Sequence, residues 1–178
     1  MLETIYHYDF LILDFLRDHL HCPFLDGVMP VFSFLGNGGA LWLLVTLYLI
    51  TTKKHRRHGV LLLIGLAVGF ICVSLLLKPL IARPRPSWLM PEVLLLIPNP
   101  ADFSFPSGHT MASFVAAFLL LKYRRPLGLA ALPVAILIAF SRLYLYVHYP
   151  SDVLFSILLA AMVSFLIIKF DKRRSCSK

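Results

Sequence analysis

Apolar residues in this chain gather into five stretches that are separated by short polar segments, at residues 28–50, 59–77, 107–121, 127–147 and 151–168. A helix rises about 1.5 Å per residue, so roughly 20 apolar residues cross a hydrocarbon core about 30 Å thick. The first, second and fourth stretches meet this length. The other two are marginal, which fits spans whose outer ends carry polar residues. The pattern predicts an all-α polytopic transmembrane helix bundle of about five spans.

Residues 4–21 have a different pattern, with apolar and polar positions on opposite helical faces. One face carries Ile5, Tyr8, Ile12, Phe15 and Leu16, and the other carries Asp14, Arg17, Asp18 and His21. Polar side chains this dense argue against a full crossing. We therefore expect residues 1–26 to form an amphipathic segment in the membrane interface, with a tilted sixth span as the alternative.

Composition supports a membrane protein. The 178 residues are 59% hydrophobic and 15% charged, with a mean hydropathy of +0.81, whereas a soluble domain carries about 25% charged residues. The three cysteines, at positions 22, 72 and 176, lack metal-ligand spacing and imply no disulfide framework. The first residues do not resemble a signal peptide. No repeat or linker interrupts the chain, so we expect a single membrane-embedded domain over residues 1–178.

The net charge of +8 raises the question of nucleic-acid binding, but the distribution of the charges argues against it. Twelve of the 17 Lys and Arg residues follow the first, third and fifth apolar stretches: Lys53, Lys54, Arg56, Arg57, Lys122, Arg124, Arg125, Lys169, Lys172, Arg173, Arg174 and Lys178. Eight of the nine acidic residues fall at the opposite ends. By the positive-inside rule, the basic ends and the C-terminus are cytoplasmic, in a multi-pass protein of the cell membrane.

Four other basic residues lie near the outer ends of the second and fourth stretches, against this preference: Lys78, Arg83, Arg85 and Arg142. Snorkelling towards lipid phosphates explains single cations well. It explains four converging cations less well, so we expect them to serve an anionic ligand.

The segment SRLYLYVHYPSD, residues 141–152, carries an Arg, a His and an Asp at the junction of two apolar stretches, where charge is costly. Pro150 favours the first turn of a new helix, so one helix should end near Val147 and another should begin near Pro150. His148 then lies in the gap, and Asp152 in the first turn can hold one imidazole nitrogen. The other nitrogen is left to attack an electrophile. Taken alone, the pair could instead be a polar helix cap at the membrane interface.

Three clusters share the predicted outer face: KPLIARPRP at 78–86, FPSGHT at 105–110 and the segment at 141–152. Together they suit phosphoryl transfer. Lys78, Arg85 and Arg142 supply cations for phosphate oxygens, and Ser107 with the Gly108 amide forms an anion seat at a helix start. Of the two histidines, one can attack phosphorus while the other protonates the leaving oxygen. No metal site or cofactor is expected.

These clusters resemble the signature of the type 2 phosphatidic acid phosphatase superfamily: K, six residues, RP; then PSGH; then SR, five residues, H, three residues, D. Every signature position is matched within residues 78–152. The resemblance implies that His148 is the nucleophile, oriented by Asp152, and that His109 is the general acid. It further implies that the phosphate is held, without a metal, by five residues: Lys78, Arg85, Ser107, Gly108 and Arg142. Arg83 does not fit the motif spacing and is treated as auxiliary.

The expected substrate is a lipid phosphate or diphosphate, since the predicted site lies at the outer edge of the bilayer. The compact chain looks most like small bacterial undecaprenyl diphosphate phosphatases. Phosphatidylglycerophosphate and phosphatidic acid phosphatases are nearly as similar, and some lipid A phosphatases share the motifs. An anion or lipid transporter is a different class that stays open. It would need polar residues along the spans, whereas the charges gather at one end, which favours an enzyme.

Overall fold

The computed structural model describes residues 2–176, which are helical with irregular connections. The elements are α1 (Leu2–Leu20), α2 (Pro23–Leu35), η1 (Asn37–Gly39), α3 (Ala40–Thr51), η2 (Lys53–His55), α4 (Arg56–Phe70), η3 (Ile71–Leu77), α5 (Lys78–Ile81), α6 (Pro86–Leu89), α7 (Gly108–Tyr123), α8 (Arg125–Tyr144) and α9 (Pro150–Cys176). The predicted all-α class is confirmed. Lys178, which contributed to the predicted topology, lies outside the described residues.

Fewer helices are long and apolar enough to be candidate spans than the five crossings that the sequence predicted. Within residues 2–176, three helical segments are long and apolar enough to cross: Lys53–Leu89, Arg125–Tyr144 and Pro150–Arg173. Helices α2 and α3 make a fourth candidate if the bent pair counts as one span. Helix α7 has only 16 residues, so the predicted count of five is not confirmed.

The stretch predicted as a single first span is broken in the middle. Helices α2 and α3 meet at a bend of 48°. Gly38 and Gly39 in the break have φ values of +58° and +68°, a left-handed conformation that glycine adopts without a Cβ clash. The glycines therefore turn the chain between two short helices.

Helix α7 is short because it lies inside the bundle. It packs against α4, α8 and α9, and buried side chains occur all around it, from Met111 to Leu120. Its low amphipathicity is typical of a helix enclosed on every side. Trp42, which by its residue type would be expected in the membrane interface, is buried here instead and donates its indole N–H to Ser113 Oγ of α7 at 2.9 Å.

The outer surfaces of α3, α4, α8 and α9 carry many exposed large apolar side chains, among them Leu44, Phe70, Ile136 and Leu158. In water such patches would drive aggregation, whereas in a bilayer they face lipid chains. They are the surfaces of a multi-pass membrane protein.

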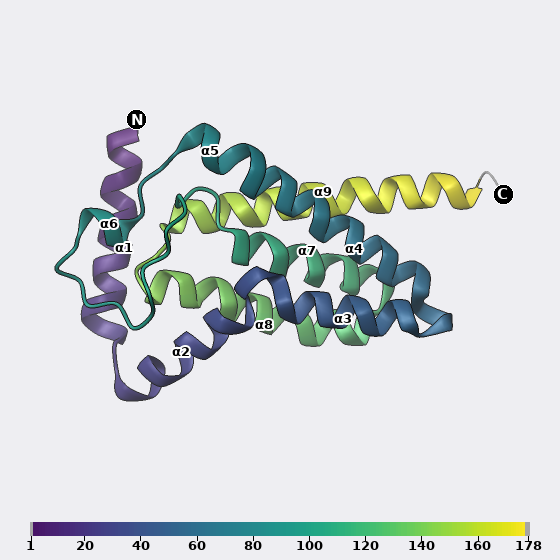
Figure 1. Cartoon of the computed structure of the whole chain (residues 1–178), viewed down its shortest axis with the longest axis horizontal. Helices are drawn as coiled ribbons and strands as arrows, with labels where there is room; N and C mark the ends of the chain where they lie inside the picture. The colour runs from purple at the N-terminus through teal and green to yellow at the C-terminus, as the bar shows by residue number, and fades with distance from the viewer. Residues whose placement is uncertain (1, 177–178) are drawn as a thin grey trace.

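The predicted cytoplasmic segments come together at one end of the bundle. Arg57 at the start of α4 donates to Asp171 of α9 at 2.8 Å, and the Tyr123 hydroxyl at the end of α7 donates to the same carboxylate at 3.0 Å. The opposite end holds the α5–α6–α7 connection and the α8–α9 junction (Figure 1). The three motif clusters lie at this opposite end.

Helix α1 crosses the motif-bearing end of the bundle at a steep angle to the long helices (Figure 1). Its predicted apolar face points away from the protein, with Tyr8 60% and Phe15 55% exposed. The side that packs on the bundle carries Leu13 and the carboxylate of Asp9, both almost fully buried. This helix is not among the candidate spans of the described chain.

The α7–α8 hairpin generates a stability prediction. A Cβ added at Gly128 would lie 2.2 Å from the backbone nitrogen of Leu121, where no side-chain movement can relieve the clash. We expect Gly128→Ala to destabilise the protein by about 1–3 kcal/mol through overpacking, measured as a lower Tm in detergent. Gly27→Ala is the control, since nothing lies within 4 Å of its added Cβ. Equal Tm values for the two variants would contradict the close approach of the hairpin.

Candidate active site

The junction of α8 and α9 places His148 as the sequence predicted. Helix α9 begins at Pro150 as expected, while α8 ends at Tyr144, three residues before the predicted end near Val147. Tyr146 accounts for the earlier end, because its φ of +58° is incompatible with a continuing helix. His148 lies in the gap between the helices and is 1% exposed.

The geometry around His148 indicates which ring nitrogen carries the proton. Its Nε2 lies 3.2 Å from Nη1 of Arg85, and because a guanidinium can only donate, Nε2 must accept. The proton is then on Nδ1, which faces Oδ2 of Asp152 at 3.4 Å. Burial, reinforced by the charge of Arg85, lowers the pKa of His148 well below its ordinary value. The ring is therefore neutral, with its lone pair on Nε2.

Asp152 is fully buried, and both of its carboxylate oxygens accept hydrogen bonds. Oδ2 accepts from the Ser104 hydroxyl at 2.5 Å and from the Tyr149 amide at 3.0 Å. Oδ1 accepts from Nη1 of Arg83 at 2.5 Å. These contacts hold the carboxylate in place beside His148.

Arg85 is 2% exposed and is held mainly by backbone carbonyls. Its Nε donates to the Asp102 carbonyl and its Nη1 to the Val147 carbonyl, each at 2.6 Å. Two carbonyls fix the plane of the guanidinium before any ligand binds. Such preorganisation suits a phosphate site, because planar Arg binds two oxygens at once.

Asp102 bridges two of the predicted phosphate-binding cations. Its carboxylate accepts from Nζ of Lys78 and, at 2.6 Å, from Nη2 of Arg85. Burial would raise the pKa of Asp102, but hydrogen bonds and charges from Lys78 and Arg85 outweigh it and hold the pKa well below its usual range. The Asp102 carboxylate is thus an anion that pairs with two cations predicted to bind a phosphate.

Arg142, in the last turn of α8, is 3% exposed and donates through Nη1 to the Ser33 hydroxyl of α2. Its Nε is buried and makes no hydrogen bond within the described chain. A buried donor without a partner is costly. Since Arg142 lines the cavity described below, an anionic ligand there could satisfy it.

The PSGH cluster forms the start of α7. Ser107 is the N-cap and is fully buried, with its hydroxyl accepting from the Thr110 hydroxyl at 2.9 Å. Gly108 and His109 line the cavity, whereas Ser107 does not. Nε2 of His109 lies 2.9 Å from Oδ1 of Asn37, in the break between α2 and α3.

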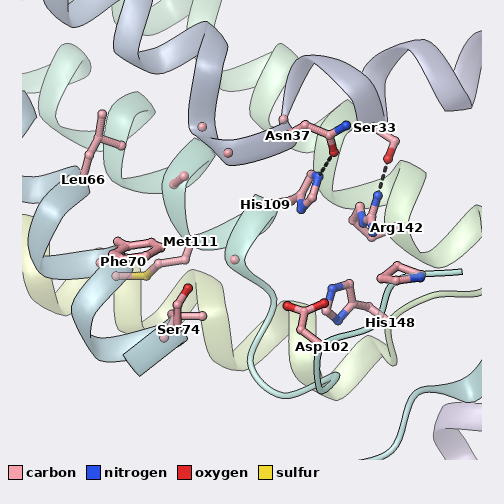
Figure 2. A pocket seen from close by; sticks show the side chains of 18 of the residues that line it. Ser33, Asn37, Leu66, Phe70, Ser74, Asp102, His109, Met111, Arg142 and His148 are labelled. Carbon is pink, nitrogen blue, oxygen red and sulfur yellow. Dashed lines mark hydrogen bonds between the residues drawn. The ribbon is translucent and has the colours of Figure 1, made fainter. Parts of the chain in front are cut away.

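These residues surround a single cavity of about 1030 Å³. Its polar end is lined by Lys78, Arg85, Gly108, His109, Arg142 and His148, and its apolar part reaches Leu66, Phe70 and Met111. Figure 2 shows His109 and His148 on the same side of the pocket, with Arg142 between them and Asp102 beside His148. The fold thus brings residues of all three sequence clusters to one cavity. A phosphate group would fill only a small part of the volume.

Several residues at the site had no place in the sequence prediction. Asp102, Ser104, Asn37 and Ser33 lie outside the catalytic motifs, and each contacts a motif residue through the fold. Arg83, predicted to be auxiliary, binds Asp152 directly. Only Asp102 and Ser104, which lie four and two residues before PSGH, carried a usable signal, namely their proximity to that motif.

Comparisons with known proteins agree with this geometry. Residues 58–176, more than half of the chain, match the sequence profile of the PAP2 superfamily. An undecaprenyl-diphosphatase from Sulfolobus acidocaldarius is 32% identical over 148 residues, which cover 83% of this chain and 71% of that protein. Undecaprenyl-diphosphatase BcrC from Bacillus subtilis is 29% identical over 155 residues, which cover 85% of this chain and 77% of that protein.

The fold has a close counterpart of known structure. A transmembrane PAP2-type phosphatidylglycerolphosphate phosphatase from Bacillus subtilis superposes with a TM-score of 0.77. The two proteins are 27% identical, and the match covers 96% of this chain and 87% of that chain.

The contacts of Asp102 with Lys78 and Arg85 lead to a prediction about phosphate binding. Carbonyls hold Arg85 and Lys78 independently of the Asp102 side chain, so Asp102→Asn should leave the cations in place and remove a competing negative charge. We expect inorganic phosphate to inhibit lipid turnover with a Ki roughly tenfold lower, equivalent to about 1.4 kcal/mol.

Glu92→Gln is the matched control for this measurement. Glu92 is an acidic residue of the same α6–α7 connection and does not line the cavity, so its Ki should stay unchanged. Weaker phosphate inhibition of Asp102→Asn than of wild type would show that Asp102 supports the cation site rather than competing for it.

Proposed function

This chain belongs to the PAP2 superfamily and is a membrane lipid phosphatase; from that premise we propose that it hydrolyses undecaprenyl diphosphate to undecaprenyl phosphate and inorganic phosphate. The observation that carries the proposal is a cavity in which three buried cations and two histidines adjoin a wall of apolar side chains. Two relatives that cover more than four fifths of the chain are named as undecaprenyl-diphosphatases.

The first step is attack by Nε2 of His148 on the terminal phosphorus. An N–P bond forms, and the bond from phosphorus to the bridging oxygen breaks. His109, as an imidazolium, gives its proton to the oxygen that leaves with the lipid. Asp152 accepts the Nδ1–H of His148 and stabilises the positive charge that develops on this ring.

In the second step, water hydrolyses the phosphohistidine. His109 takes a proton from the attacking water, the N–P bond breaks, and inorganic phosphate leaves with its negative charge. Each proton that His109 donates in the first step is therefore recovered in the second. Lys78, Arg85, Arg142 and the Gly108 amide stabilise the equatorial oxygens in both steps, while Ser107 acts indirectly by capping α7.

The lipid chain would occupy the apolar part of the cavity. That part is lined by residues of α2, α4 and α7, among them Phe34, Leu63 and Leu66. Both the headgroup and the first isoprene units can then be enclosed together. The remaining chain would extend into the bilayer, because the lipid tails there are as apolar as the chain itself.

We propose that the site faces the outside of the cell membrane. The basic segments that end α3, α7 and α9 gather at the other end of the bundle, and the positive-inside rule assigns that end to the cytoplasm. In this topology the bent α2–α3 pair and the enclosed α7 complete five crossings, α1 lies in the outer interface, and the C-terminus is cytoplasmic.

Phosphatidylglycerophosphate is the alternative substrate. The solved phosphatidylglycerolphosphate phosphatase covers 96% of this chain, and a phosphatidylglycerophosphatase B from Bacillus subtilis is 30% identical. Phosphatidic acid would fit the same cation set. The cations bind the terminal phosphate in every case, so the lipid beyond it decides the specificity.

A substrate panel tests the proposal. Purified protein in detergent with EDTA is offered undecaprenyl diphosphate, phosphatidylglycerophosphate and phosphatidic acid, and released phosphate is measured. We expect metal-independent release that is fastest from undecaprenyl diphosphate. His148→Ala should lose roughly three orders of magnitude or more in kcat, because it removes the nucleophile.

His58→Ala is the control histidine variant, since His58 lies at the far end of α4 beside Tyr123 and should retain full activity. Faster release from phosphatidylglycerophosphate would transfer the proposal to that lipid. Activity that survives in His148→Ala would refute the phosphohistidine mechanism.

The leaving group provides a separate test of His109. An alkoxide leaves much less readily than a phosphate monoester, so it depends more on a proton donor. We expect His109→Gln to reduce kcat more for phosphatidic acid than for undecaprenyl diphosphate, and least for p-nitrophenyl phosphate, whose phenolate needs no proton. An equal loss on all three substrates would instead assign His109 to phosphate binding.

A further inference from the structure

Arg83 lies between two buried carboxylates that come from opposite ends of the sequence. Its Nη1 donates to Asp152 at 2.5 Å and its Nη2 to Asp9 of α1 at 2.7 Å. The guanidinium is also packed over the Tyr149 ring, with 3.8 Å between its Cζ and the ring centre. Asp9 is 4% exposed, so this is an interior contact rather than a surface ion pair.

Asp9 also binds the first turn of α9. Its Oδ1 accepts from the Ser151 amide at 2.9 Å, and its Oδ2 accepts from the Ser151 hydroxyl at 2.5 Å. One carboxylate thus holds both the residue next to Asp152 and the cation that binds Asp152. Tyr6 of α1 also contacts this cation, with 4.5 Å between Cζ of Arg83 and the centre of the Tyr6 ring.

The charges of this group favour a positive His148. If Arg83 paired with Asp152 alone, the pair would be neutral and would offer the imidazole little stabilisation. With Asp9 included, two carboxylates share one guanidinium, and the buried group carries a net charge of −1. That charge acts on a ring that becomes cationic when its Nε2 bonds to phosphorus, in an interior where charges interact strongly.

We propose that Asp9 is a positioning residue of the active site, which acts through Arg83 on Asp152 and so on His148. The inference rests on the role proposed above for His148. It makes the amphipathic N-terminal helix a part of the catalytic apparatus rather than only a surface anchor. Neither Asp9 nor Arg83 lines the cavity, so their effect should fall on the chemical step and leave substrate binding intact.

The test compares two acidic residues of α1. Asp14 also ties α1 to the α8–α9 junction, since its Oδ1 accepts from the Tyr146 hydroxyl at 2.9 Å, but it has no contact with Arg83 or Asp152. We expect Asp9→Asn to lower kcat by about 10- to 100-fold, as small misplacements of catalytic groups do, with KM within about twofold of wild type. Asp14→Asn should keep both constants near wild type.

Further measurements separate positioning from folding. Single-turnover quenching should show phosphohistidine formation slowed in Asp9→Asn by the same factor as kcat, and Asp9→Glu should recover part of the rate. The double variant Asp9→Asn/Arg83→Gln should be no slower than Arg83→Gln alone, because both residues act along one path. Size-exclusion chromatography in detergent gives the folded fraction by which each rate is corrected.

Several outcomes would overturn the proposal. They are a corrected kcat of Asp9→Asn equal to that of Asp14→Asn, a rise in KM with kcat unchanged, or losses that multiply in the double variant. The rates are taken on whichever lipid the wild type hydrolyses fastest, so an error in the proposed substrate leaves this test intact. Undiminished activity of His148→Ala would identify failure of the catalytic assignment itself.

Discussion

Three buried cationic side chains, and a fourth, Arg83, that is 10% exposed, lie at one end of a bundle with apolar outer faces, and the cost of their burial determines the rest of the site. An isolated charge in such surroundings is very unfavourable unless it is paired and hydrogen-bonded. Arg85 meets the requirement with two carbonyls, Lys78 with Asp102 and a carbonyl, and Arg83 with two carboxylates. Arg142 keeps one buried donor without a partner. The site is therefore preorganised for an anion, as expected of a membrane lipid phosphatase.

The sequence predicted the parts of this site that depend on local spacing. Pro150 starts a helix, and only three residues separate His148 from Asp152, so the first turn of α9 brings the carboxylate back beside the imidazole. The partners contributed by Asp9, Asn37 and Ser33 could not be predicted, because each comes from a helix whose rotation is set by packing. The apolar side of α1 that the amphipathic pattern predicted lies exposed, away from the bundle. The pattern gave no sign that Asp9 on another side would be buried.

The membrane topology was harder to predict for a related reason. Hydropathy counts residues along a straight helix, whereas here α2 and α3, a candidate span only when taken together, meet at a bend of 48°, and α7 is only 16 residues long. At about 1.5 Å per residue, α7 extends roughly 24 Å, less than a hydrocarbon core. Its first two residues, Gly108 and His109, line the cavity within the bundle. The helix that carries these two site residues is therefore shorter than a hydropathy count expects of a membrane span.

The connection from α1 through Arg83 to α9 also bears on how the protein is made. Ser151 and Asp9 are 142 residues apart in the chain, and the N-terminal part of a protein is synthesised first. Until the last helix emerges, Asp9 and Arg83 have no partner in α9, and His148 has no carboxylate beside it. Most of the chain must therefore be synthesised before these contacts can form, and a product that stops short of α9 lacks all of them.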